Sequence, residues 1–427
     1  MRKFIIFAFQ IINMGGEQQY CRNKLLIMKE LGYSVSLFSA DRGEIFIDDL
    51  KQYSSNTFQE LRYPPFCFKK RRITKIVNEI SKRIGECDFS DIIESVGPAT
   101  SQWAELVAKQ LGCRHICYML DEFFTVSKKE STFFEFKLSR KELIGIAPQT
   151  LPLLFKNVRE LSESENSWFD AACSNVVEDV PCLFDWFNSI ASDNRVKIGS
   201  IGRLEKGFVL PCLNEIIEFA NNNKDLPIDI VLIGGTNDKI VLKKIKKMIR
   251  KNRNIRFYVT GFIYPIPLAL IQAIDVFFST AGSALISAVD YDKITISVDT
   301  HTGKPIGILN YTTTENMYAD NDSRENMACL LNSILRDHFC ENNPKLNMEK
   351  TKNDDTFVEE VKNQIAFCSS EKTTDYYDVL SISPDSIKYK LYAIIGKTFG
   401  TKALYFFHIK ILHFIKSHLK GNTKEQY

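Results

Sequence analysis

Short apolar runs alternate with amphipathic stretches along most of this chain. Residues 3–11 form a nearly continuous apolar run, which is typical of a strand buried on both faces of a parallel sheet. The pattern predicts a helix over 17–31, stopped by Gly32, and a second strand over 34–39. Strands are also predicted over 90–95 and 115–120, with a helix over 100–111 between them. The first 190 residues are therefore expected to form βα units around a parallel sheet.

The same alternation starts again after a polar stretch at 188–195, where the crossing to a second domain is expected. The predicted elements are strand 196–201, helix 209–221, strand 228–233, a basic helix over 237–251, strand 255–260, helix 268–273, strand 275–278 and strand 294–298. We therefore predict an α/β protein with two Rossmann-like, doubly wound domains, over 1–190 and 195–340, that face each other across a cleft. Residues 341–427 form a helical extension.

Composition narrows the class of protein. The chain has 427 residues, 44% of them hydrophobic and 25% charged, as in ordinary globular domains. A net charge of +3 is too small to argue for nucleic acid. Eleven cysteines without a Cys-x-x-Cys pair indicate reduced thiols and no zinc site. The apolar run at 4–9 is too short for a signal peptide, and no stretch reaches the roughly 20 apolar residues of a spanning helix. A cytoplasmic protein is expected.

A glycine-bounded loop after strand 196–201 is the strongest candidate site. Gly202 and Gly207 allow tight turns, a helix follows, and Arg203 and Lys206 supply two full charges. Helix N–H groups and cations of this kind can hold a diphosphate. The loop lacks the Lys-Ser/Thr of a Walker A motif and the spacing of a dinucleotide fingerprint. The alternative is an ordinary strand-to-helix turn with two solvated basic residues.

Acidic or glycine residues also follow predicted strands of the first half. They are Gly15, Gly16 and Glu17 after the first strand, Glu94 after strand 90–95, and Asp121 and Glu122 after strand 115–120. Because ligands bind beyond the carboxyl ends of parallel strands, these residues are expected to line the cleft. Asp121 or Glu122 is the candidate general base. The alternative is that each acid caps a helix or is solvated.

The order of these pieces resembles the GT-B nucleotide-sugar glycosyltransferases, in particular the group 1, family-4-like branch. The resemblance covers residues 1–40 and 195–310. It lies in the combination of Gly15–Gly16, the Gly202–Arg203–Leu204 and Lys206–Gly207 element, Gly234–Gly235, and the run from Asp275 to Ser279. It implies transfer of a sugar from a UDP- or GDP-sugar to a saccharide or lipid-linked acceptor in cell-envelope polysaccharide biosynthesis. No cofactor and no metal are expected.

The donor side differs from the family pattern. The family carries two glutamates eight positions apart in the donor loop, whereas Ser279 and Ser287 have that separation here. The expected donor-binding residues are therefore Gly202, Arg203, Lys206, Gly234, Gly282, Ser283 and Ser287. Two alternatives remain open: a non-catalytic GT-B protein that serves a partner enzyme, and a nucleotide-sugar epimerase.

The tail contains helical patterns over 323–338 and 355–368, and the family resemblance implies that its helices return to the first domain. Residues 402–420 form a basic amphipathic pattern with Lys402, Lys410, Lys416 and Lys420. Such a helix either lies on an anionic membrane surface or packs on the core with a solvated face. His408, His413 and His418 are expected on its surface, because no carboxylate or cysteine stands at ligand spacing.

Overall fold

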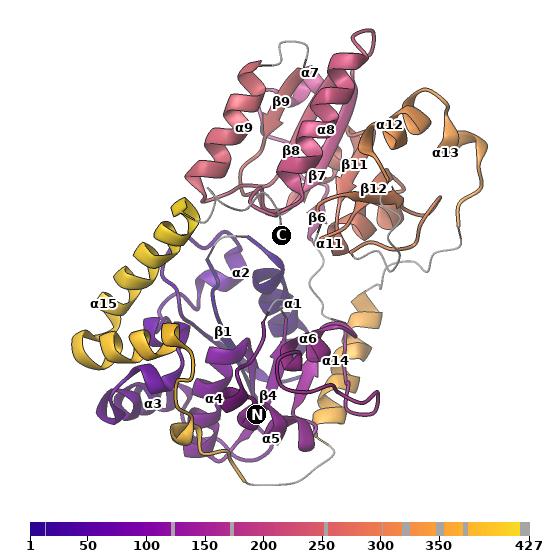
Figure 1. Ribbon diagram of the computed structural model, residues 1–427. Helices are drawn as coiled ribbons and strands as arrows, with labels where there is room; N and C mark the ends of the chain where they lie inside the picture. Colours follow the sequence, from indigo (N-terminus) through magenta and orange to yellow (C-terminus); the bar gives the residue numbers. More distant parts are fainter. Residues whose placement is uncertain are drawn as a thin grey trace. The chain divides into compact units, whose positions relative to one another are not determined.

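The computed structural model describes residues 1–12, 14–120, 124–170, 175–251, 255–300, 302–317, 325–346, 354–369 and 375–418. The chain forms two compact units, with bounds of 1–13, 17–173 and 353–426 for the first and of 14–16 and 174–352 for the second. Each unit is built around its own sheet (Figure 1).

The first unit contains a five-stranded, fully parallel sheet. The strand order is β2-β1-β3-β4-β5. The bounds are β1 Lys3–Ala8, β2 Ser34–Ser39, β3 Ile92–Val96, β4 Arg114–Met119 and β5 Leu143–Gly145. Because helices cover both faces, β1, β3 and β4 are buried at nearly every position. Only β1 is also apolar throughout after Lys3, as the sequence pattern predicts.

Helices follow the strands of the first unit. They are α1 Gly16–Glu30, α2 Asp48–Lys51, α3 Lys70–Ile84, α4 Pro98–Leu111, α5 Lys128–Ser139 and α6 Thr150–Phe155, with short 3-10 turns at 59–62 and 65–67. In α4, Pro98 occupies the first turn and Gly112 ends the helix in the left-handed conformation. The buried face of α3 consists of isoleucine and valine at helical spacing, such as Ile73, Ile76 and Ile80.

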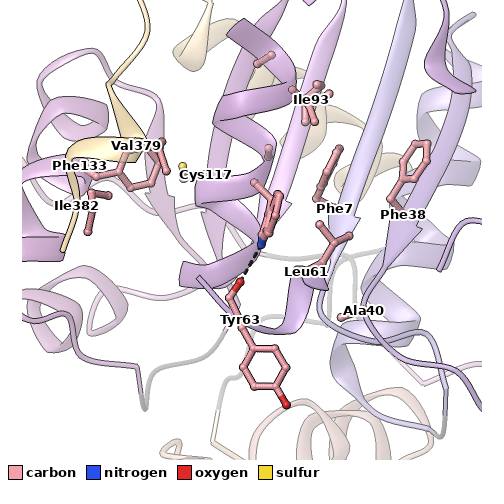
Figure 2. Packing of buried hydrophobic residues seen from close by; sticks show 14 of the residues in the cluster. Phe7, Phe38, Ala40, Leu61, Tyr63, Ile93, Cys117, Phe133, Val379 and Ile382 are labelled. Carbon is pink, nitrogen blue, oxygen red and sulfur yellow. Dashed lines mark hydrogen bonds between the residues drawn. The ribbon is translucent and has the colours of Figure 1, made fainter. Parts of the chain in front are cut away.

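The core of the first unit includes residues of the tail. Figure 2 shows Phe7 and Phe38 beside Leu61, and Val379 and Ile382 beside Phe133. The dashed line is the hydrogen bond that the indole of Trp103 donates to the carbonyl oxygen of Tyr63, at 2.8 Å. The tail elements are α14 Asp354–Cys368, a 3-10 turn at 379–381 and α15 Ile387–His418.

The second unit contains a six-stranded sheet with the order β13-β12-β11-β7-β8-β9. Its bounds are β7 Val196–Ile201, β8 Ile228–Ile233, β9 Ile255–Val259, β11 Val276–Ser279, β12 Ile294–Val298 and β13 Pro305–Ile308. β13 pairs antiparallel with β12 and is the one departure from a parallel sheet among the described strands. Ile230 and Leu232 face one core cluster while Val231 and Ile233 face another, so the sheet is buried on both sides.

The helices of the second unit are α7 Phe187–Ala191, α8 Val209–Asn222, α9 Lys239–Lys251, α10 Leu268–Gln272, α11 Ala281–Leu285, α12 Met327–Leu335 and α13 Phe339–Asn342; a π-helical turn over 286–290 continues α11. Residues ahead of β7 belong to this unit as well. The short strand β6 (Val177–Glu178) pairs with β10 (Ile266–Pro267), and the Trp186 ring lies 4.9 Å from that of Tyr258.

The predicted fold class is confirmed, and most predicted elements agree with the structure to within two or three residues. Two differences affect the site and the surface. β3 ends at Val96, so the expectation that Glu94 follows its strand is wrong. The last helix begins at Ile387, 15 residues ahead of the predicted start, and Gly400 breaks its helical geometry.

Candidate nucleotide-binding site

The strand order of the second sheet indicates where a ligand is expected. The chain runs from β7 to β8 and β9 on one side, and later returns to β11 on the other side of β7. The gap between the loops that leave β7 and β11 is therefore the topological switch point of this sheet. The hydroxyl of Ser279, at the end of β11, donates to the carbonyl oxygen of Ile201, at the end of β7, over 3.4 Å. The two predicted donor loops thus begin side by side.

Two glycines let the ends of β7 and β8 touch. Gly202 has a φ of +133° and Gly234 a φ of +150°, which side chains disfavour. A Cβ on Gly234 would lie 1.9 Å from the carbonyl oxygen of Gly202. The N–H of Gly234 donates to the hydroxyl of Thr260 at 2.9 Å. Sequence reasoning missed Thr260. The only sequence feature that could have indicated its role is its place at the end of a predicted strand.

Arg203 and Lys206 lie on a turn that the core holds in place. Leu204, between them, is 2% exposed, and its N–H donates to the carbonyl oxygen of Gly235 at 3.1 Å. The Arg203 side chain is 45% exposed, and one of its nitrogens lies 3.8 Å from a carboxylate oxygen of Glu205. Lys206 is half-buried, and its Nζ lies 3.7 Å from where a Cβ of Gly202 would be. A rigid turn therefore carries two cations at the carboxyl edge of the sheet.

The loop after β11 brings small residues to the same edge. The hydroxyls of Thr280 and Thr300 lie 2.7 Å apart, and Ala281 has a φ of +54° that is unusual outside glycine. Gly282 is exposed, with open space where a side chain would stand. The hydroxyl of Ser283 accepts a hydrogen bond from Asn175 at 3.2 Å. Gly282 and Ser283 thus stand at the switch point, as does the Gly202 loop.

Ser287 does not fit the donor-binding role predicted for it. It is fully buried in the π-helical turn, and its hydroxyl lies 3.1 Å from the carbonyl oxygen of Ser283, 3.0 Å from that of Ala284 and 2.9 Å from the hydroxyl of Thr295. The spacing of eight residues from Ser279 is therefore not a sign of a ribose contact. Both serines are packed inside the second unit.

In the first unit, the Glu17 side chain stabilises the loop between β1 and α1. A carboxylate oxygen of Glu17 accepts from the backbone N–H of Phe9 at 2.6 Å. The amide of Gln18 donates to the carbonyl oxygen of Gln10 at 2.8 Å. Gly15 and the exposed Gly16 complete this loop between β1 and α1. The loop lies at the carboxyl end of β1, next to β2 and β3, where a ligand of this sheet is expected.

Glu94 is an internal residue, which corrects its predicted place at a strand end. It is fully buried in the middle of β3, beside the phenol of Tyr20 and 3.3 Å from Nζ of Lys24. Burial lowers the pKa of Lys24 and raises the pKa of Tyr20. The Glu94–Lys24 pair joins α1 to the sheet, and the Glu94 carboxylate is not accessible to a ligand. Asp121 and Glu122, the predicted bases, lie outside the described residues.

A buried polar cluster in the first unit was not predicted from the sequence. His115 lies 2.7 Å from Glu105 through Nδ1 and 2.8 Å from the hydroxyl of Ser95 through Nε2. This is the order of base, orienting acid and nucleophile in hydrolases. However, the exposed fractions of Ser95, His115 and Glu105 are 0, 1 and 0%, so no substrate reaches the hydroxyl. The arrangement is structural.

The same cluster contains Lys137, whose Nζ lies 2.8 Å from Glu105, 2.8 Å from Glu142 and 3.0 Å from the carbonyl oxygen of His115. Burial acts against ionisation of Glu105, yet Lys137 and His115 outweigh it and lower the pKa of Glu105 to about 2. Burial and the charge of Lys137 lower the pKa of His115 to about 4, so this imidazole is neutral at pH 7.

The residues that the structure describes contain neither a metal-binding cluster nor a membrane-spanning helix. No group of three or more histidine, cysteine, aspartate or glutamate side chains in this part of the chain is arranged to hold a metal ion. No helix among the described residues is both long and apolar enough to cross a membrane.

Comparisons with known proteins support the architecture. No family model and no curated protein matches the sequence. A glycosyltransferase from Rickettsia africae has a similar structure, with a TM-score of 0.57 and 14% identity, over 87% of this chain and 100% of that one. A protein assigned as a UDP-N-acetylglucosamine 2-epimerase from Listeria monocytogenes gives a TM-score of 0.52 and 14% identity over 88% of this chain and 98% of that one.

A third similar structure is the pneumococcal O-GlcNAc transferase in complex with UDP and GlcNAc. Its TM-score is 0.50 and its identity 9%, over 87% of this chain and 100% of that one. At these identities the likeness concerns the fold. The chain therefore has the GT-B fold, as its resemblance to nucleotide-sugar glycosyltransferases predicts.

Proposed function

We propose that this protein is a glycosyltransferase that moves a sugar from a UDP- or GDP-sugar to a saccharide or lipid-linked acceptor in cell-envelope polysaccharide biosynthesis. The observation that carries the proposal is the rigid turn at the end of β7. It carries Arg203 and Lys206 on the β7 side of the topological switch point, and the Gly202 backbone of the same loop contacts Gly234 at the end of β8. Two cations on a glycine-bounded loop can bind the negatively charged oxygens of a diphosphate.

The proposed chemistry is electrostatic. As the bond between the sugar and the diphosphate breaks, negative charge builds up on the departing phosphate oxygens. Arg203 and Lys206 would stabilise that charge without moving, because their turn is anchored by the buried Leu204. Such cations take the place of a metal ion, so we propose metal-independent transfer. Gly282 and Ser283 would contact the same diphosphate from the β11 side.

The acceptor side is proposed at the loop between β1 and α1, with Gly15, Gly16 and Glu17. Asp121 or Glu122 remains our candidate for the base that takes the proton of the acceptor hydroxyl. We also propose a cytoplasmic protein that touches an anionic membrane surface through its C-terminal basic helix.

An epimerase is the second candidate, because the Listeria protein shares this fold and the donor loop lacks the glutamates of the transferases. The two activities leave different products. With UDP-N-acetylglucosamine and a mixture of acceptors, a transferase releases UDP, whereas an epimerase yields an isomeric nucleotide sugar and no UDP. Release of UDP supports our proposal, and accumulation of an isomer without UDP would replace it with the epimerase.

The donor site is tested with UDP and uridine as a matched pair of ligands. We expect Arg203→Ala to weaken UDP binding roughly 10- to 150-fold, since a charge-assisted hydrogen bond contributes about 1.5–3 kcal/mol. Uridine binding should be nearly unchanged, because the lost contacts belong to the phosphates. Calorimetric titration measures both ligands.

Lys243→Ala is the control for this experiment, since Lys243 is an exposed cation of α9 in the same unit. It should leave the binding of both ligands unchanged. An equal loss for UDP and uridine in Arg203→Ala would mean that the turn is purely structural. Full retention of UDP binding would place the donor site elsewhere.

A further inference from the structure

The outward side of α15 exposes an unusual number of large apolar side chains. Ile387, Leu391 and Ile394 recur at helical spacing and are 79, 41 and 61% exposed. Phe399, just ahead of the break at Gly400, is 72% exposed. Phe406 and Ile409 remain exposed beyond the break. Ile387, Leu391 and Ile394 form a short row along one side of the helix, ahead of the break at Gly400.

The opposite side of α15 packs on the core of the first unit, so the exposed row is not the side by which the helix attaches to that core. Tyr392 and Ala393 are 2 and 6% exposed. A Cβ on Gly396 would lie 2.3 Å from the carbonyl oxygen of Cys67, so the helix backbone presses directly on the first unit. Beyond the break, Leu404 is fully buried. The orientation of α15 on its unit is therefore fixed.

The charge of α15 is of one sign. Its 32 residues include no aspartate or glutamate. Lys388, Lys390, Lys397 and Lys402 are exposed, and no ion pair is found for them among the described residues. His408 does not add to this charge, because its ring nitrogen lies 2.6 Å from the hydroxyl of Tyr392 and burial lowers its pKa to about 4.

A second basic segment lies beside the break in α15. Lys69, Lys70 and Arg71, at the start of α3, are exposed. Glu60 joins the two helices, since one of its carboxylate oxygens accepts from Arg72 of α3 and, at 2.7 Å, from the hydroxyl of Thr401 of α15. Figure 1 shows α15, in yellow, bent into two pieces. Cations of both helices thus accompany the apolar row.

We propose that the first unit lies on an anionic lipid bilayer through this surface. We call it the α15 surface: Ile387, Leu391, Ile394 and Phe399, with Lys388, Lys390, Lys397, Lys402 and the start of α3. An apolar row flanked by lysines, without acids, suits a helix that lies in the plane of the lipid headgroups. A protein partner of ordinary composition would find no carboxylate on α15 to pair with its own lysines. The contact proposed from the sequence involved residues 402–420, whereas the α15 surface begins at Ile387.

Helix α15, beyond its break at Gly400, is connected to the loop proposed for the acceptor. The Arg62 guanidinium lies 5.4 Å from the ring centroid of Tyr405 in α15 and 4.8 Å from that of Phe9. It also pairs with Asp41, next to the end of β2. Phe9 begins the β1–α1 loop, which Glu17 closes. If the proposed transferase activity holds, this loop stands near the bilayer, and the acceptor is a membrane-resident, lipid-linked saccharide.

Flotation with lipid vesicles tests the proposal on the full chain. We expect the protein to float with vesicles of phosphatidylcholine containing about 30% phosphatidylglycerol, and not with phosphatidylcholine alone. Lys390→Glu with Lys397→Glu should weaken this binding by at least about 30-fold, since two attractive charges become repulsive. Ile387→Ser with Ile394→Ser should weaken it by at least about tenfold, and both pairs change exposed positions only.

The matched control is Lys243→Glu with Lys246→Glu, an equal change of charge in the exposed basic helix α9. This control should retain vesicle binding. No binding by the unaltered protein, or an equal loss in the α9 control, would overturn the proposal. Binding of UDP to the same variants is measured in parallel, so failure of the α15 surface is distinguished from failure of the donor site.

Discussion

Two groups of charged residues, one in each unit, differ in where the fold places them. In the first unit, Glu105, Lys137 and Glu142 lie inside the fold, with exposed fractions of 0, 2 and 4%, and they pair with one another. In the second unit, Arg203 and Lys206 lie beyond a strand end, on a turn whose apolar residue is buried. Both units place charged residues near the strands of a doubly wound sheet.

The contrast separates charges that hold the fold from charges available to a ligand. A buried charge must be paired within the protein, because leaving water costs several kcal/mol per ion. The cluster around Lys137 meets this condition, and it also binds the tail, since Glu105 accepts from the N–H of Tyr377 at 2.8 Å. An exposed cation at a strand end has no such requirement. Whether a charged residue is buried in the fold or exposed beyond a strand end is therefore more informative about function than the sign of its charge.

The largest effect is expected from Lys137→Met. Removing the cation leaves Glu105 and Glu142 buried without their shared partner, which should destabilise the first unit by about 3–5 kcal/mol. Urea denaturation followed by tryptophan fluorescence measures it, with the fully buried Trp103 as the reporter in this unit. Arg203→Met is the comparison and should change stability by no more than about 0.5 kcal/mol. Equal losses of stability in the two variants would mean that Lys137 is no more important for the fold than Arg203.

A smaller effect is expected from Gly234→Ala, which tests whether the β7–β8 contact matters for the donor site. The new methyl would overlap the carbonyl of Gly202, 1.9 Å away, and force the loop to move. We expect a loss of about 1–3 kcal/mol in stability together with weaker UDP binding. Gly282→Ala, which meets open space, should cost less stability. Unchanged UDP binding in Gly234→Ala would show that the contact is not part of the donor site.

The smallest effect concerns acid stability of the first unit. His115 has a pKa of about 4 in the fold against 6.5 for the free side chain, so the unfolded chain binds more protons between these values. Stability is therefore fully present above about pH 6.5 and falls as the pH drops toward 4. The expected loss is on the order of 1 kcal/mol between about pH 7.5 and 5.5.

Thermal unfolding at the two pH values measures this loss. His115→Gln should make the first unit less dependent on pH in this window, whatever its effect on overall stability. A pH dependence as steep in His115→Gln as in the unaltered chain would assign the effect to other groups. Glu105, whose pKa is lowered to about 2, contributes stability that is lost only below about pH 4.5, outside the window.

The apolar pattern by itself determined the architecture and the positions of the loops after β7 and β8. Strands such as Val196–Ile201 and Ile228–Ile233 were predicted at their observed bounds, because apolar residues alternate along the first and fill nearly every position of the second. Gly202 and Gly234 were identified because glycines after such strands permit backbone shapes that other residues avoid. These are local properties, and local properties can be read from the sequence.

Only the tertiary structure decided which polar residues are internal. Glu94 and Ser287 have the sequence context of site residues, yet both are fully buried, with Glu94 beside Lys24 of α1 and Ser287 beside Thr295 of β12. The Glu105 cluster has no local signature, since its members come from α4, β4, α5 and the tail. Likewise the sequence showed a basic C-terminal helix, but the packing of Tyr392 and Gly396 decided that Ile387 and Ile394 face solvent. Burial depends on contacts between residues far apart in the chain, and the order of residues does not specify these contacts one by one.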